Sequence, residues 1–310
     1  MKRAPTGLAL CALPLFAWAA PQASPEPQSP AHPLLELAHE REKDRDRSEH
    51  GASDGAGVRE ALHRLEQAHV PGDAECAASI GAARYVDLYL LLANAYFDAG
   101  EFPAAAAAYR HALACRPHAP EVLAALAGTL FNMRDYAGTR EAITRSLEMD
   151  PRSVEANRRA ANLDFVQEHW ADAMARFRYI ASSDTDRVRA GYGQLMYWLS
   201  QRRAGIAKPE FITRTPGEGW PQPLLLFMRG EYTEQELLEP IHAGDDPGNI
   251  QVETSTDERL CEALFYVGEE YWARGQPDVA RDYFTALVNI KVLDFLEHGL
   301  ALAEIAKLRR

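Results

Sequence analysis

Similar residues recur every 34 positions between residues 86 and 187. Pro117 and Pro151 are 34 residues apart, and Thr185 occupies the next step. The sets that coincide in this register are Ala93, Ala127 and Ala161; Phe97, Phe131 and Phe165; Phe102, Tyr136 and Trp170; and Tyr109, Ile143 and Phe177. A fixed period of about 20–50 residues is typical of repeats that bury their apolar faces only against their neighbours. The sequence therefore predicts three tandem helical hairpins over 86–187.

A period of 34 with small residues at the helix crossing and a proline at the junction resembles the tetratricopeptide repeat. A fourth such unit falls within 255–310. Its consensus positions are held by Gly268, Tyr271, Gly275, Ala280 and Phe284. Gly268 allows the two helices of this unit to pack closely, because it has no side chain. The predicted fold class is all-α: a tetratricopeptide-repeat solenoid of helical hairpins with an irregular central unit and a C-terminal packing helix.

The segments around the repeats are less regular. Residues 188–254 are interrupted by proline and glycine and predict an irregular helical unit. Two pairs, Thr233 with Glu236 and Ser255 with Glu258, have the spacing of a capping box at a helix start. Residues 58–85 predict N-terminal capping helices. Residues 20–57 are rich in proline and in acidic residues, a composition that buries too little apolar surface to offset the entropy of ordering. They predict a disordered linker, with no more than a transient helical turn around Leu34–Leu37.

The first 19 residues have the features of a signal peptide. A basic start precedes the apolar run 7–19, and Ala17-Trp18-Ala19 offers a small-x-small cleavage pattern. The run is too short to span a bilayer stably. We expect cleavage before Ala20 and export to the periplasm. The alternative is a lipoprotein anchored to a membrane through Cys11, although Leu10 stands where a lipobox needs a small residue.

Composition restricts the class of function. The chain has 33 Lys and Arg against 45 Asp and Glu, a net charge of −12. A nucleic-acid binder needs clustered basic residues to displace counterions, so nucleic acid is not an expected partner. The motifs of hydrolases, phosphate loops, zinc proteases and dinucleotide folds are missing from the sequence, which predicts no enzyme, no cofactor and no metal site. An oxidising compartment permits a Cys76–Cys115 disulfide, and buried cysteines are the other interpretation.

Several stretches resemble one family of envelope proteins. "YWLSQRRAG", "LLLFMRGEYTEQELLEPI" and "DFLEHGLALAEI", together with the order of the repeats, are similar to the NlpI-type tetratricopeptide lipoproteins of Gram-negative cell envelopes. The string Phe-x-Glu-His-x-x-Ala-Leu-x-Glu at 295–304 is the most specific match. The resemblance implies a homodimeric, non-enzymatic adaptor that docks a C-terminal-processing protease and peptidoglycan hydrolases, notably a murein endopeptidase. A structural scaffold in outer-membrane or polysaccharide assembly is the alternative function.

The first helices of such a stack line a concave groove, through the fifth, ninth and twelfth positions of each repeat. The residues expected at this protein-binding groove are Asn94, Phe97, Phe131, Arg158, Asn162, Phe165, Glu269 and Trp272. An aromatic row with amide donors could hold an extended or helical peptide. The other interpretation is that the rings pack between neighbouring first helices.

The last helix contains Glu297 and His298 in an apolar pattern. Adjacent helical residues point about 100° apart, so the two side chains do not converge on one metal ion, and we expect Asp294 and His298 to form a surface pair instead. Two apolar stripes run along the same helix, and the dimer or packing contacts expected from them are Phe295, Leu296, Leu300, Leu302 and Ile305. One stripe would cover the last hairpin. The other would be covered by segment 205–245 or by a second subunit, with the helices before Val86 as the alternative dimer contact.

Overall fold

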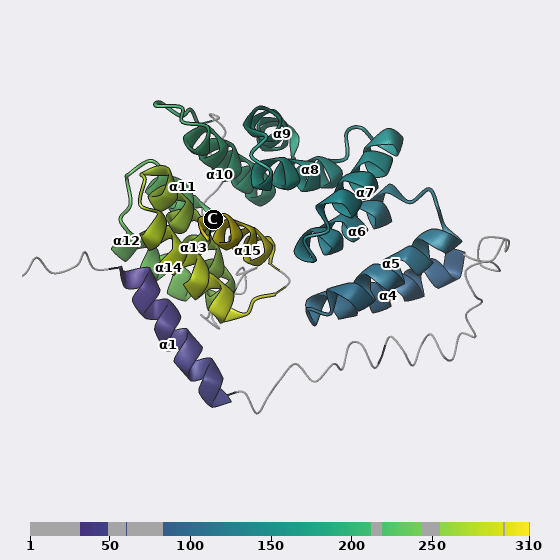
Figure 1. Ribbon diagram of the computed structural model, residues 1–310, viewed down its shortest axis with the longest axis horizontal. Coiled ribbons are helices and arrows are strands. Elements are labelled where there is room, and N and C mark those ends of the chain that lie inside the picture. The colour runs from purple at the N-terminus through teal and green to yellow at the C-terminus, as the bar shows by residue number, and fades with distance from the viewer. Residues whose placement is uncertain are drawn as a thin grey trace, which may run out of the picture. The chain divides into compact units, whose positions relative to one another are not determined.

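The computed structural model describes residues 32–48, 60, 83–211, 219–243, 255–293 and 295–309. Over these ranges the chain is all-α, as predicted, with 13 helices (Figure 1). They are α1 (Pro33–Ser48), α4 (Ala83–Asp98), α5 (Phe102–Cys115), α6 (Pro120–Asn132), α7 (Tyr136–Met149), α8 (Val154–Val166), α9 (Trp170–Ser183), α10 (Arg187–Arg203), α11 (Gln222–Met228), α12 (Glu234–His242), α13 (Thr256–Ala273), α14 (Pro277–Ile290) and α15 (Leu296–Leu308).

The helices pack as sequential antiparallel pairs, α4 with α5, α6 with α7, α8 with α9, and α13 with α14. The first three pairs share one turn. A residue in the left-handed region follows the first helix at Gly100, Arg134 and Glu168, and its amide donates to the carbonyl three residues earlier at 2.9, 2.9 and 3.0 Å. This is the Schellman way of ending a helix. Its recurrence every 34 residues is consistent with a helical repeat arrangement.

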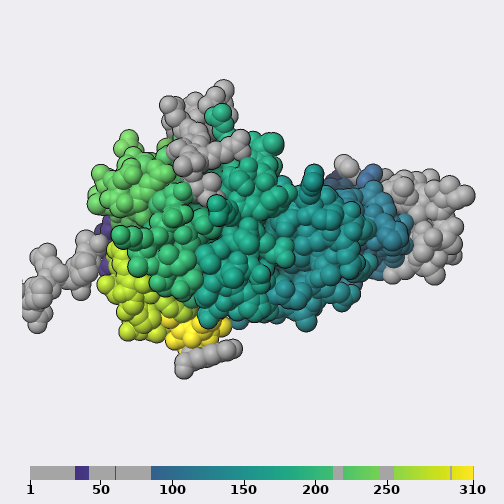
Figure 2. Space-filling view, turned by 90° about the horizontal axis from the view of Figure 1, so that it is seen from above, coloured from purple at the N-terminus to yellow at the C-terminus, as the bar shows by residue number. Residues whose placement is uncertain are grey.

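Each hairpin also contacts the next one, through α5 with α6 and α7 with α8. The surface colours accordingly pass in chain order from the blue α4–α5 region through teal to green in the space-filling view (Figure 2). The expected capping boxes at Thr233 and Ser255 are both formed. Gly268 packs closely as expected, because a Cβ added there would lie 2.8 Å from Cε1 of Phe284.

Helix α1 corrects the prediction of a linker over 20–57. Residues 33–48 are helical, and Leu34, Leu37 and Ala38 are buried against the core. The helix contacts α12, α13 and α14. The spacing of these three apolar residues, one turn apart, gives a single buried face within an otherwise polar segment. Average composition does not reveal that face, because the charged residues that follow it lower the mean hydropathy of the segment.

Helix α15 makes contacts that the sequence did not predict. It packs on α13 and α14 as expected, but it also contacts α6 and α8, the first helices of two repeat hairpins. Gly299 makes the approach close, since a Cβ there would lie 2.6 Å from Oδ1 of Asn132. Within the described residues α15 therefore lies against repeat hairpins of its own chain as well as the last hairpin, and a dimer contact through its second apolar stripe stays a prediction. Leu300 is fully buried, whereas Phe295, Leu296, Leu302 and Ile305 are half-buried.

Burial also changes the expectation for Glu297 and His298. They are only 6% and 8% exposed, so His298 is not part of a surface pair, and Asp294 lies outside the described residues. Burial, followed by the charge of Arg134, lowers the pKa of His298. The pair sits where α15 meets the rest of the fold.

Some predictions fall on residues that the structure does not describe. The signal peptide 1–19, Cys11, Cys76 and nearly all of 58–85 lie outside the described residues. Cys115 takes part in a disulfide, and its expected pairing with Cys76 stays a prediction. Within the described ranges, no helix is both long enough and apolar enough to cross a membrane.

Candidate functional site

A cavity of about 330 Å³ lies where α15 meets the inner helices of the repeats. Its lining comes from α4, α8, α9, α10, α13, α15 and Phe295, which precedes α15. Pockets that bind small molecules start at about this volume. Part of the wall is apolar, through Phe97, Phe177, Met196 and Leu296. The polar part is unusual, because opposite charges face one another across the space.

One wall is basic. Arg158 and Arg159 of α8 share a single carboxylate, Glu155, at 2.7–3.0 Å. Burial opposes ionisation of Glu155, but Arg159 and Arg158 outweigh it and lower the pKa of Glu155 to about 2. Burial and the neighbouring Arg158 lower the pKa of Arg159 to about 10, so the Arg159 guanidinium remains charged at neutral pH. Two cations against one anion leave this wall with one net positive charge.

Gly128 explains how Arg159 reaches this position. A Cβ at residue 128 would lie 2.7 Å from Cζ of Arg159, so any larger side chain would displace the guanidinium. Arg189 of α10 also lines the cavity and pairs with Asp184 at 2.9 Å and Asp186 at 3.0 Å. Its charge is therefore neutralised locally, and the net charge of the wall stays with the α8 pair.

The opposite wall is acidic. Glu262 of α13 accepts hydrogen bonds from the hydroxyl of Tyr192 at 2.7 Å and from the indole nitrogen of Trp220. Burial, reinforced by the charge of Glu297, raises the pKa of Glu262 well above its usual range. Burial also raises the pKa of Glu297 to about 7, against a backbone hydrogen bond and the more distant Arg158. Among the described residues, neither carboxyl forms an ion pair.

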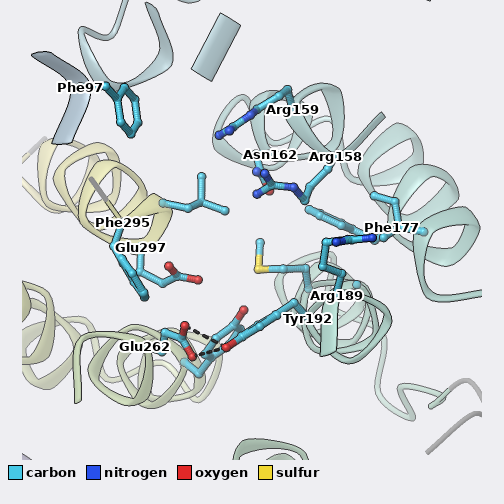
Figure 3. A pocket seen from close by; sticks show the side chains of 15 residues that line it. Phe97, Arg158, Arg159, Asn162, Phe177, Arg189, Tyr192, Glu262, Phe295 and Glu297 are labelled. Carbon is cyan, nitrogen blue, oxygen red and sulfur yellow. Dashed lines mark hydrogen bonds between the residues drawn. The ribbon is translucent and has the colours of Figure 1, made fainter. Parts of the chain in front are cut away.

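Asn162 of α8 lines the same cavity (Figure 3). Its side chain is buried, with 1% of the residue exposed, and both its amide nitrogen and its amide oxygen lack a hydrogen-bond partner in the described structure. An unsatisfied buried amide costs about 1–3 kcal/mol for each missing bond. Buried polar groups usually have a hydrogen-bond partner in the protein or in ordered water, so an exception such as Asn162 calls for an explanation.

A second charged cluster has a structural role. Arg203 of α10 pairs with Glu269 of α13 at 2.5 Å and with Glu304 of α15 at 3.3 Å. Its guanidinium lies 4.0 Å from the ring centroid of Trp272. Lys307 adds a bond to Glu304 at 2.8 Å. The cluster joins three helices and fixes α15 in place.

The residues predicted for a docking groove therefore do not form one surface. Phe131, Phe165 and Glu269 are buried, and the two rings pack edge-on or tilted against the aromatic residues that open their partner helices. This burial favours the packing interpretation for them. Asn162 and Phe97 line the cavity, as does Arg158.

Asn94 of α4 is exposed and accepts a hydrogen bond from Tyr109 at 2.6 Å. Trp272 lies beneath Arg203, inside the cluster that holds α15.

Sequence reasoning missed the acidic wall. Glu262 and Tyr192 lie 70 positions apart, and no local motif links them. In the sequence, Glu297 stands beside His298, and that neighbour suggests only a metal or catalytic pair. Two features of the sequence could have indicated the cavity. Asn162 is a polar residue at an inward-facing repeat position, and α15 has a second apolar stripe that needs a partner.

The described residues hold no group of three His, Cys, Asp or Glu side chains placed to bind a metal ion. When the chain is compared with known protein families, no family model matches it.

Proposed function

We propose that this chain is a tetratricopeptide-repeat protein of the NlpI type, which acts in the cell envelope as a non-enzymatic adaptor. It would hold a C-terminal-processing protease and peptidoglycan hydrolases together in the periplasm. The observation that supports this most is the Schellman turn repeated at Gly100, Arg134 and Glu168, at the 34-residue step of that repeat. The resemblance of 295–304 to the family adds the partner class.

An adaptor works by raising local concentration. Two proteins held on one rigid scaffold meet at an effective concentration in the mM range when the reach is short. Stacked hairpins suit this task, because they form an extended concave binding surface. The proposal requires no chemistry from the scaffold itself.

The docking surface must differ from the full inner face. Helix α15 packs on α6 and α8, so the proposed docking surface is placed on exposed residues of α4. Leu91 of α4 is 38% exposed, and Asn94 beside it is also exposed. Exposed leucine next to an amide suits contact with a partner peptide. The proposed homodimer would then use the segment before Val86, which was the alternative to α15.

The decisive experiment is a degradation time course of a murein endopeptidase by the partner protease, with and without the purified protein. We expect faster degradation with the protein, and slower capture for Leu91→Ser. Met149→Ser is the matched control, since Met149 is 37% exposed and belongs to a different helix, α7. Equal rates with and without the protein would refute the adaptor and leave the assembly scaffold as the better hypothesis.

A further inference from the structure

The cavity beneath α15 is arranged for a ligand with two opposite charges. Figure 3 shows Arg158 and Arg159 on one side of the space and Glu262 and Glu297 on the other. The basic side has two guanidiniums for one carboxylate, and the acidic side has two carboxyls without an ion pair among the described residues. The basic wall therefore has one positive charge without a counterion, and the acidic wall has two carboxyls whose ionised forms a cationic group would stabilise.

We propose that the cavity binds a small zwitterion, either a free amino acid or a short peptide with both termini charged. Its ammonium group would lie against Glu262 and Glu297, and its carboxylate against Arg158 and Arg159. The unpartnered amide of Asn162 would donate to and accept from the polar backbone of the ligand. The apolar wall of Phe177, Met196 and Leu296 would contact its side chain.

A single ion fits these observations less well. An anion would satisfy the arginines but would increase the repulsion on the acidic side, while a metal or free amine would do the reverse. Only a ligand that carries both charges improves both walls at once. The volume of about 330 Å³ also exceeds the space that one ion needs and suits an amino acid or a short peptide.

Binding should release protons. Glu297, whose pKa burial raises to about 7, holds a proton in about half of the molecules at neutral pH. An ammonium group beside it favours the carboxylate. The proton leaves the Glu297 carboxyl for the buffer, and the ammonium becomes its counterion. The other charged or titratable groups of the described residues that line this site are Glu262 and Tyr266 on α13, Tyr192 and Arg189 on α10, and Arg158 and Arg159 on α8.

Isothermal titration calorimetry on the full chain can test the proposal with defined probes. Leucine, alanyl-leucine and trialanine supply both charges. N-acetyl-alanyl-leucine lacks the ammonium, and alanyl-leucine amide lacks the carboxylate. We expect at least one of the three zwitterions to bind, and each blocked form of alanyl-leucine to bind about tenfold more weakly or worse, which corresponds to about 1.4 kcal/mol. Repeating the titration in two buffers of different ionisation enthalpy should show net proton release.

Two variants locate the site. Glu297→Gln and Arg158→Met should each weaken binding by about tenfold, and Glu297→Gln should also abolish most of the proton release. Glu148→Gln and Arg178→Met make the same changes at exposed positions and should bind like the parent protein. Circular dichroism confirms that each variant is folded.

Three outcomes would overturn the proposal. The first is that no zwitterion binds at concentrations up to about 10 mM, which corresponds to a binding free energy weaker than about 3 kcal/mol. The second is that the blocked dipeptides bind as well as the free one, and the third is that the two site variants bind normally. The probes are small, so this test does not depend on the adaptor function. Failure of the degradation assay would leave the ligand site standing, and the reverse also holds.

Discussion

Replacing Glu297 by glutamine should stabilise the protein at neutral and alkaline pH and change little in acid. Burial raises the pKa of Glu297 to about 7 from an ordinary 4.5. The folded state therefore keeps the proton longer than the unfolded state does, and stability is lost as pH rises from about 4.5 through about 7. The difference of about 2.5 pH units, at about 1.36 kcal/mol for each, gives a cost of about 3 kcal/mol above pH 7. Glutamine has a similar shape and carries no charge, so it escapes that cost.

Urea denaturation followed by circular dichroism can measure this difference without ligand. The parent, Glu297→Gln and the exposed control Glu148→Gln would be compared near pH 5 and near pH 8. We expect the Glu297 variant to gain about 2–3 kcal/mol relative to the parent at the higher pH and less than about 1 kcal/mol at the lower one. The control should show no such pH dependence. An equal difference at both pH values, or a less stable variant near pH 8, would show that the buried carboxyl is not strained by ionisation.

Three further predictions concern stability. Arg203→Met removes the partner of the fully buried Glu269 and Glu304. We expect the free energy of unfolding, measured by urea denaturation near pH 8, to fall by about 3–5 kcal/mol. A fall below about 1 kcal/mol would contradict the role of the cluster. Arg134→Gly relieves the strain of a non-glycine residue in the left-handed region, at φ 59°. We expect thermal unfolding to show a gain of about 0.5–1 kcal/mol in stability. A lower melting temperature would refute this prediction. Leu34→Ala leaves a cavity at a fully buried site in α1. We expect this to weaken the packing of α1 by about 2–4 kcal/mol and so to speed proteolysis within residues 33–48. An unchanged cleavage rate would mean that other contacts hold α1.

The local features of this fold were predictable because they depend on neighbours in the sequence. The 34-residue step, the capping boxes at Thr233 and Ser255 and the close packing at Gly268 all follow from residues at most a few turns or one repeat apart. Each has its own stereochemical requirement, such as an N-cap oxygen or an absent Cβ. These requirements can be read from composition and spacing alone.

The candidate site was not predictable in the same way. Its acidic wall combines Glu262 with Glu297, which only the return of α15 onto the inner helices brings together. The second apolar stripe on α15 indicates that another surface covers this face. An apolar face does not identify that surface, and a second subunit is consistent with the same pattern. The hydrophobic effect is non-directional, so it favours burial of an apolar face without selecting the element that buries it.

The return of α15 has a consequence for how the molecule comes apart. In an open array each hairpin is stabilised only by the next, and unfolding spreads inward from the ends. Here α15 links α6, α8, α13 and α14 across the chain, so the hairpins between them cannot open one at a time without breaking that link. The α4–α5 hairpin belongs to a separate core cluster with α6. Amide exchange should therefore divide the protein into one large cooperative unit and a smaller one that opens first.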